Sequence, residues 1–168
     1  ERVGEESYPI HIKLDTGMHR LGFMEGELDM LTETLGETPS VKVATIFSHL
    51  NCSDMPQEDR YTREQIARFD RMSGRLAAAL PYPVLRHTAN SAAIERFPEA
   101  QFDMCRLGLG LYGFGFEHND ELKPVSTLKS RIVQLKHLSA GEAVGYGRAG
   151  KLTRDSVTAT VPMGYADG

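Results

Sequence analysis

Hydrophobic and polar positions along the first two thirds of the chain follow two alternating periods. In "PIHIKL" the apolar residues Ile10, Ile12 and Leu14 occupy every second position, and this period predicts a strand. In "EGELDMLTETLG" leucines recur three and four positions apart, which predicts a helix that ends at Gly36. A strand-type segment is therefore followed directly by a helix-type segment.

The same alternation continues to about residue 115. "VKVATIFSHL" predicts a buried strand, and the helix-type segment that follows it is ended by Pro81. "PVLRH" predicts a short strand, "SAAIERF" a short helix capped by Asn90 or Ser91, and "FDMCRLGLGLYGFG" a last strand that runs into glycines. This order predicts a parallel sheet of α/β class and fits the C-terminal half of a (β/α)8 TIM-type barrel.

The pattern changes after the polar stretch "FEHNDELKP". From about Pro124 the segments "PVSTLKSRIVQLKHL", "EAVGYG" and "SVTATVPMG" are strand-like, and no helical period separates them. We therefore expect two domains. Residues 1–120 would form a partial barrel of about four βα units, and residues 121–168 the start of an all-β domain.

Composition and charge narrow the class of protein. Hydrophobic content of 40% and charged content of 25% are ordinary for a soluble globular chain, and no apolar run approaches the ~20 residues that span a bilayer. The formal charge of -4 gives no basic surface, so neither nucleic acid nor membrane is an expected partner. The two cysteines, Cys52 and Cys105, fit no zinc pair or disulfide framework, which indicates a reducing cytoplasm. Because the chain begins without methionine and stops at "VPMGYADG", we expect a piece of a longer protein.

Polar groups follow each predicted strand of the first domain. They are Arg20, His49, the turn from Thr88 to Ser91, and Arg106. The carboxyl ends of barrel strands are where such folds place their chemistry. Because Gly108 and Gly110 have no side chains, a phosphate could approach the backbone N–H groups near them closely. Ser91 adds a hydroxyl at a helix start. Taken alone, these residues are explained more simply by an ordinary turn and an ordinary helix cap.

The motifs "KLDTGMHRLGF", "FSHLNCSD", "HTANSAA", "CRLGLGLYG", "VGYGR" and "VPMGYADG", in this order, resemble the alanine racemase family. The resemblance covers residues 9–168 and implies a pyridoxal 5'-phosphate enzyme with a barrel and a C-terminal β domain. It also implies a head-to-tail homodimer that interconverts L-alanine and D-alanine for the peptidoglycan of the bacterial cell wall. The family's cofactor lysine lies in a motif like "KANAYGHG", which these residues lack. We therefore expect a central fragment without the Schiff-base lysine.

The resemblance implies roles for residues near the first strand and near the substrate. Arg20 would contact the phenolic oxygen of the cofactor and the substrate carboxylate. Lys13 would be carbamylated, as in some members, and hold that arginine, or it would be an ordinary solvated lysine. The backbone of Met18 would close on the substrate carboxylate, and Tyr165 and Asp54 would line a narrow substrate entrance. Asp15, by contrast, is expected to fix the turn that follows it.

Further roles are implied for the second half of the chain. Arg106 would face the pyridine nitrogen, and because arginine keeps its proton, that nitrogen would stay unprotonated. Gly108 and Leu109 would donate backbone N–H groups to the phosphate, together with Ser91. Tyr146 would be the base on one face of the substrate Cα, acting on the partner subunit's barrel.

A hydrogen-bonded chain from Arg106 through His49 would lead to Tyr146. Positive charge on these two residues would help the tyrosine to lose its proton.

Three alternatives stay open at this point. A barrel metal hydrolase would use His11, His49 and His87 as ligands. A non-catalytic fragment would bind phosphate or self-associate through unpaired sheet edges. A homologue that only binds the cofactor is the third, and the presence of Tyr146 argues against it.

Overall fold

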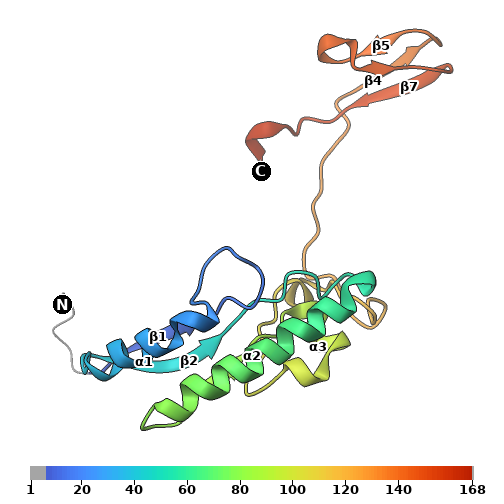
Figure 1. Cartoon of the computed structure of the whole chain (residues 1–168). Helices are drawn as coiled ribbons and strands as arrows, with labels where there is room; N and C mark the ends of the chain where they lie inside the picture. Colours follow the sequence, from blue (N-terminus) through green and yellow to red (C-terminus); the bar gives the residue numbers. More distant parts are fainter. Residues whose placement is uncertain (1–6, 168) are drawn as a thin grey trace. The chain divides into compact units, whose positions relative to one another are not determined.

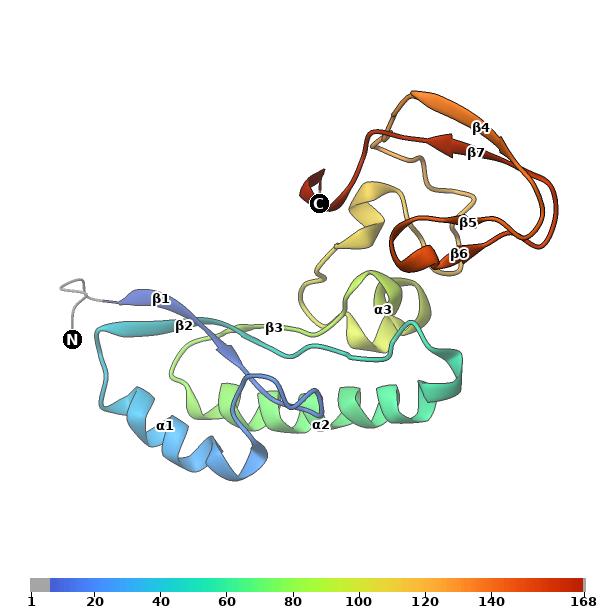
Figure 2. The ribbon, with the colours of Figure 1, turned by 90° about the horizontal axis from the view of Figure 1, so that it is seen from above.

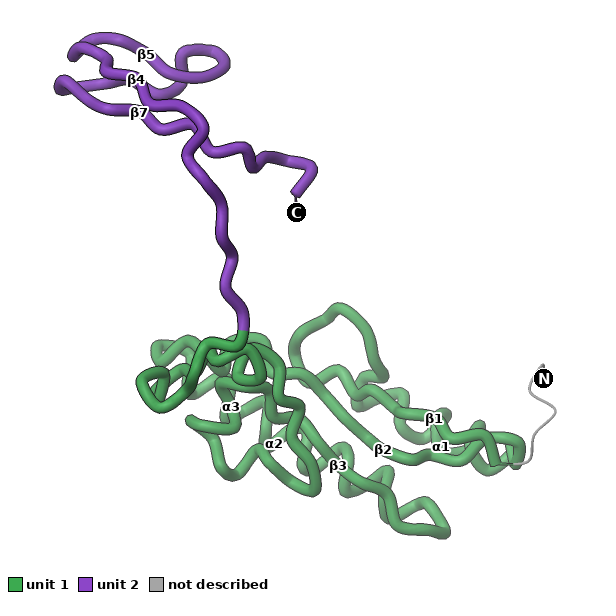
Figure 3. The backbone as a smooth tube through the Cα atoms, turned by 180° about the vertical axis from the view of Figure 1, so that it is seen from behind, with its two compact units in different colours: residues 1–125 green, residues 126–168 purple. Residues whose placement is uncertain are grey.

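The computed structural model describes residues 7–167, which fall into two compact units, Glu1–Val125 and Ser126–Gly168 (Figures 1 and 3). The first residues of the predicted barrel domain, 1–6, and the last glycine of the predicted β domain, Gly168, lie outside the described residues. The boundary predicted at residue 120 stays a prediction. Each unit is described by itself.

Unit 1 is built on a three-stranded parallel sheet. Its strands are adjacent in the order β1 (Tyr8–Lys13), β2 (Val41–Phe47) and β3 (Leu85–His87). The helices between them are α1 (Leu28–Gly36) and α2 (Asp59–Ala79), and the shorter α3 (Ser91–Arg96) follows β3. This strand and helix order confirms the predicted parallel sheet.

Helices α1 and α2 cover the same face of the sheet (Figure 2). The core between them is apolar and comprises Ile12, Leu14, Leu28, Leu31, Val43, Ile46, Phe69, Met72 and Leu76. Phe69 is fully buried and meets Phe102 edge to face at 5.0 Å between ring centroids. The apolar face of each helix is therefore turned toward the sheet, as the helical period predicted.

None of the helices in residues 7–167 has the length and apolar content needed to span a bilayer.

The predicted last strand of unit 1, residues 102–115, is wrong. The segment forms turns and a 3₁₀ helix at Leu109–Tyr112, although two backbone hydrogen bonds hold its start beside β3. Leu107, Leu109 and Leu111 are each more than half exposed, so their two-residue spacing has no buried face behind it. Gly113 adopts a φ of 87°, a left-handed conformation typical of a turn. The two-residue alternation of leucine and glycine has the period of a strand but does not form one here.

Unit 2 contains strands and no α-helix among its described residues, as predicted. β4 (Gln134–Leu138) pairs with β7 (Ser156–Thr160), and β5 (Ala143–Val144) pairs with β6 (Gly150–Lys151), both antiparallel. No residue between 126 and 167 is buried. Two-stranded ribbons of this kind are only marginally stable by themselves, so unit 2 needs further apolar cover.

Candidate active site

A cavity of about 480 Å³ lies in unit 1 beyond the carboxyl ends of β2 and β3. The predicted site residues that line it are Met18, His49, Asp54, Ser91, Arg106, Gly108 and Leu109. They come from loops that are far apart in the sequence, and the parallel strands bring those loops to one edge of the sheet. The structure therefore assembles much of the predicted site in one place.

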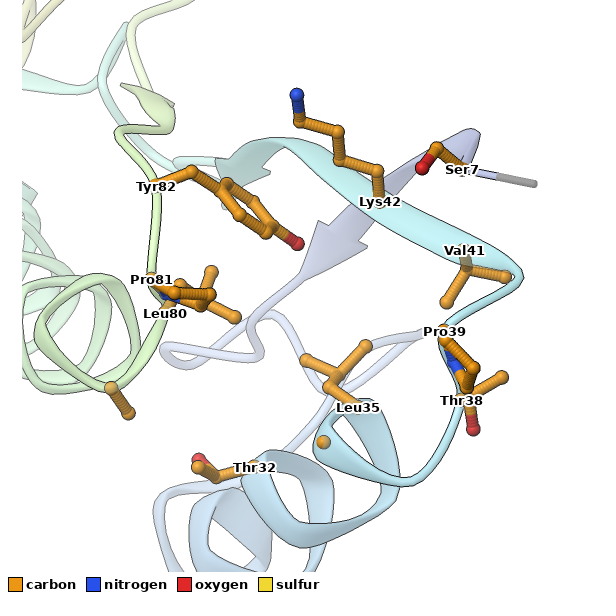
Figure 4. Close-up of a pocket in the computed structure, with 12 residues that line it drawn as sticks. Ser7, Thr32, Leu35, Thr38, Pro39, Val41, Lys42, Leu80, Pro81 and Tyr82 are labelled. Carbon is orange, nitrogen blue, oxygen red and sulfur yellow. The ribbon is translucent and has the colours of Figure 1, made fainter.

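A second cavity, of about 350 Å³, lies at the opposite ends of the strands (Figure 4). The Tyr82 hydroxyl accepts a hydrogen bond from the Val43 N–H at 3.1 Å, and the Lys42 ammonium lies 5.2 Å from the centre of the Tyr82 ring. Its described lining contains neither a carboxylate nor an imidazole. Since this is the face of a barrel that serves stability, we assign the chemistry to the first cavity.

Arg106 is the electrostatic centre of the first cavity. Its guanidinium donates to His87 Nδ1 at 2.7 Å, to the Ser48 carbonyl at 2.8 Å and to the Thr88 carbonyl at 3.1 Å. His49 Nδ1 lies 3.4 Å from the same group. Among the described residues its hydrogen bonds thus go to neutral acceptors, which hold the guanidinium in place without neutralising its charge.

His87 is locked by hydrogen bonds on both ring nitrogens. Arginine can only donate, so Nδ1 of His87 accepts and its Nε2 carries the proton that is donated to Thr45 Oγ1 at 3.1 Å. The Thr45 hydroxyl then donates to His11 Nδ1 at 2.8 Å. Burial, followed by the charge of Arg106, lowers the pKa of His87 to about 4. The imidazole is therefore neutral at pH 7, as its bond to Arg106 requires.

His49 is half-buried at the edge of the cavity. Burial lowers its pKa below the ordinary value of 6.5, and the charges of Arg106, Arg20 and Lys13 lower it further. The lowered pKa favours the neutral imidazole, so Arg106 is the cation of this pair, and the role predicted for His49 beside Tyr146 stays a prediction. Arg20 and Lys13 therefore lie close enough to His49 for their charges to act on it.

Ser91 organises the glycine loop. Its Oγ accepts hydrogen bonds from the Gly108 N–H at 2.9 Å and the Gly110 N–H at 3.2 Å. Asn90, of the two predicted caps, is the one that caps α3, since its side chain accepts from the Ala93 N–H at 3.0 Å. Two backbone donors that converge on one oxygen suit a phosphate oxygen as well. Because α3 has only six residues, these donors matter more than its dipole.

The turn after β1 is fixed by Asp15. Its carboxylate accepts from the Gly17 and His19 N–H groups, each at 3.0 Å, which confirms the structural role predicted for Asp15. Gly17 has a φ of 140°, where any side chain is strained, and a Cβ at this position would also displace the Tyr61 hydroxyl, so glycine is favoured. This turn delivers Met18 to the cavity.

Comparison with known proteins matches both units. The family model "Alanine racemase, N-terminal domain" matches residues 1–115, and "Alanine racemase, C-terminal domain" matches residues 125–168. The chain belongs to the alanine racemase family.

Similar proteins cover the chain almost from end to end. An alanine racemase of Sorangium cellulosum (strain So ce56) is 40% identical over 161 residues, which are 95% of this chain and 42% of that relative. A crystal structure of alanine racemase from D-cycloserine-producing Streptomyces lavendulae has a TM-score of 0.80 at 31% identity, over 97% of this chain and 45% of that one. An alanine racemase of Bartonella henselae, solved with covalently bound pyridoxal phosphate, has a TM-score of 0.66 at 30% identity, over 95% and 43%. The chain thus spans less than half the length of these relatives.

Some residues predicted for the site do not line the cavity. Arg20 is exposed, and Lys13 is partly exposed on β1. Tyr146 and Tyr165 belong to unit 2, where they are 97% and 103% exposed. The roles of these four residues stay predictions.

His87 is the site residue that the family resemblance did not single out. It entered the sequence analysis only as a metal ligand, yet it makes the shortest hydrogen bond to Arg106 and stacks on Phe47 at 5.3 Å between ring centroids. The sequence signal that could have identified it is its position at the end of the predicted strand "PVLRH", because the ends of neighbouring strands, including the one predicted to carry Arg106, meet at one edge of the sheet.

Across residues 7–167 no group of three or more His, Cys, Asp or Glu side chains could hold a metal ion, so the hydrolase alternative gains no support.

We expect His87 to make the stability of this chain depend on pH. Its pKa is about 4 when folded and near the ordinary 6.5 when unfolded, so the unfolded chain binds the extra proton as the pH falls between these values. Stability is therefore lost on acidification, by about 2 kcal/mol between pH ~7.5 and pH ~5. Urea unfolding of the chain and of His87→Gln at the two pH values measures this. The wild type should lose more stability than the variant, and equal losses would contradict the assignment.

Proposed function

We propose that the whole protein to which this chain contributes is a pyridoxal 5'-phosphate-dependent alanine racemase that interconverts L-alanine and D-alanine. The observation that carries the proposal is a fixed guanidinium, Arg106, in the same cavity as Ser91 and Gly108, where the Gly108 and Gly110 N–H groups converge on the Ser91 hydroxyl. The curated relatives named alanine racemase support it, as does the relative solved with covalently bound pyridoxal phosphate. D-alanine for cell-wall peptidoglycan is the product that we propose for the cell.

The residues of the cavity fit this cofactor. When bound, pyridoxal phosphate supplies the electron-withdrawing ring that makes the substrate Cα acidic. Arg106 would donate to the ring nitrogen and keep its own proton, because a guanidinium is a far weaker acid than the imidazolium of His87, whose pKa is about 4. Gly108 and Leu109, with Ser91, would donate to the phosphate. The site thus binds both ends of the cofactor with groups that stay in one protonation state at pH 7.

Substrate binding and proton transfer fall to other residues. We propose that Arg20, whose charge reaches His49, binds the substrate carboxylate and the phenolic oxygen of the cofactor. Tyr146 would take the proton from Cα of L-alanine in the partner subunit's barrel, which makes the active protein a homodimer. Asp54, which lines the cavity, would limit the substrate to small amino acids together with Tyr165, and the backbone of Met18, in the same lining, would close on the substrate carboxylate.

The test is racemisation by the purified whole protein with added pyridoxal phosphate. D-alanine should accumulate from L-alanine, and L-alanine from D-alanine, to the same final ratio. Arg106→Leu should abolish the cationic partner of the ring nitrogen and lower the rate by about 10²-fold, in the range for loss of one preorganised donor. Arg63→Leu, an exposed arginine on α2, is the matched control and should leave the rate unchanged. Failure of the wild type to form either enantiomer would overturn the proposal.

A further inference from the structure

Helix α3 holds the loop that follows Arg106 at two points. Ser91, its first residue, receives the N–H groups of the glycine loop. Glu95 stands four positions later, on the same face of the helix. Its carboxylate accepts from the backbone N–H groups of Phe116 at 2.9 Å, Glu117 at 2.7 Å and His118 at 3.0 Å. The loop is therefore attached to α3 at its start and at its end.

The next residue, Arg96, fixes α3 to the rest of unit 1. Its side chain is 6% exposed and donates to Asp59 at 2.7 Å and to the Ser53 carbonyl at 2.6 Å. The guanidinium also lies over the rings of Phe97 and Phe116, 5.1 Å and 5.3 Å from their centroids. These contacts of Arg96 hold α3 in place. A loop that is hydrogen-bonded to α3 is therefore held in place as well.

The three backbone N–H groups donate to Glu95 in its ionised form. The N–H of Phe116 is the largest cause that lowers the pKa of Glu95, and those of His118 and Glu117 lower it further, although burial opposes them. The carboxylate is therefore ionised at neutral pH. Hydrogen bonds to an ionised acceptor are about twice as strong as neutral ones, so loss of the charge loosens residues 116–118 even if an oxygen remains.

We propose that Glu95 is a positioning residue for the phosphate of the bound cofactor. It touches neither cofactor nor substrate; it anchors residues 116–118 and so keeps the N–H groups of Gly108 and Gly110 pointing at one place. The inference rests on the proposed function for the identity of the phosphate ester. It assigns to an acidic side chain the unexpected task of strengthening the binding of an anion.

The experiment compares two ligands in the cofactor-free whole protein, pyridoxal 5'-phosphate and pyridoxal without phosphate. Glu95→Gln should weaken the binding of pyridoxal phosphate about tenfold and Glu95→Ala about 10- to 100-fold, and pyridoxal should bind as in the wild type. Amide hydrogen exchange of residues 107–118 should become faster in both variants. Glu99→Gln, a half-exposed carboxylate whose nearest partner is Arg63 at 3.7 Å, is the matched control and should change neither ligand.

The outcomes separate this inference from the proposed function. A wild type that binds no pyridoxal phosphate contradicts the proposed function. A wild type that binds it, with Glu95 variants that bind it equally well, contradicts the positioning role alone. Equal weakening of both ligands also contradicts it, since that result indicates general loss of structure. If Glu95→Ala fails to fold, Glu95→Gln, which keeps an acceptor oxygen and the side-chain length, decides the matter.

Discussion

In the whole protein, Tyr146→Phe should slow the removal of the α-proton from L-alanine by about 10²- to 10⁴-fold, the usual cost of losing one general base. The substitution removes a single oxygen atom from a side chain that packs against nothing in its own unit, where it is 97% exposed. Stability of unit 2 should therefore be unchanged. The resemblance to the family implies that a lysine on the opposite face removes the proton from D-alanine. That step should be affected less.

Exchange of the α-proton into deuterated water, measured separately from each enantiomer, distinguishes the two faces. Tyr8→Phe is the control, because Tyr8 begins β1 at the end of the sheet away from the cavity. Equal losses from both enantiomers would remove Tyr146 from its role as the base for L-alanine. So would an L-alanine exchange rate like that of the control.

Local periodicity was sufficient for the parallel sheet because the buried side chains dictate it. Ile12 on β1 and Leu14 directly after it, like Leu28 and Leu31 on α1, lie in the core at the spacing that the sequence shows. The segment 102–115 showed the limit of this reasoning. Its two-residue period is real, but the leucines that produce it are exposed, and burial cannot be read from the spacing of leucines between glycines.

The site was predictable where residues are fixed by the ends of strands, and Arg106 and Ser91 do line one cavity. The protonation state of His49 was not predictable, because it depends on burial and on three cations, Arg106, Arg20 and Lys13, that are distant from it in the sequence. The hydrogen bonds between Glu95 and residues 116–118 could not be predicted either, because they join a helix to a loop 21 to 23 positions away. The roles assigned to Tyr146 and Tyr165, and the cytoplasmic location, stay predictions.

The 168-residue chain alone should show no alanine turnover above background. Covalent catalysis with pyridoxal phosphate needs a lysine amine beside the cofactor, and among the described residues the lining of the cavity holds no lysine. Lys13 lies on β1 and Lys42 lines the cavity at the opposite ends of the strands. The remaining lysines, Lys123, Lys129, Lys136 and Lys151, follow the glycine loop or lie in unit 2. Noncovalent retention of the cofactor through Ser91 and Gly108 is compatible with this expectation.

Incubation of the chain with pyridoxal phosphate, reduction with borohydride and peptide mass spectrometry locate any lysine that reacts. We expect scattered, substoichiometric labelling that Ser91→Ala does not change, because an exposed amine reacts without help from the phosphate loop. The whole protein, treated in the same way, should label one lysine outside these 168 residues. A single lysine of the chain labelled near stoichiometry, together with alanine racemisation by the chain, would show that the essential amine lies within it and that the expectation is wrong.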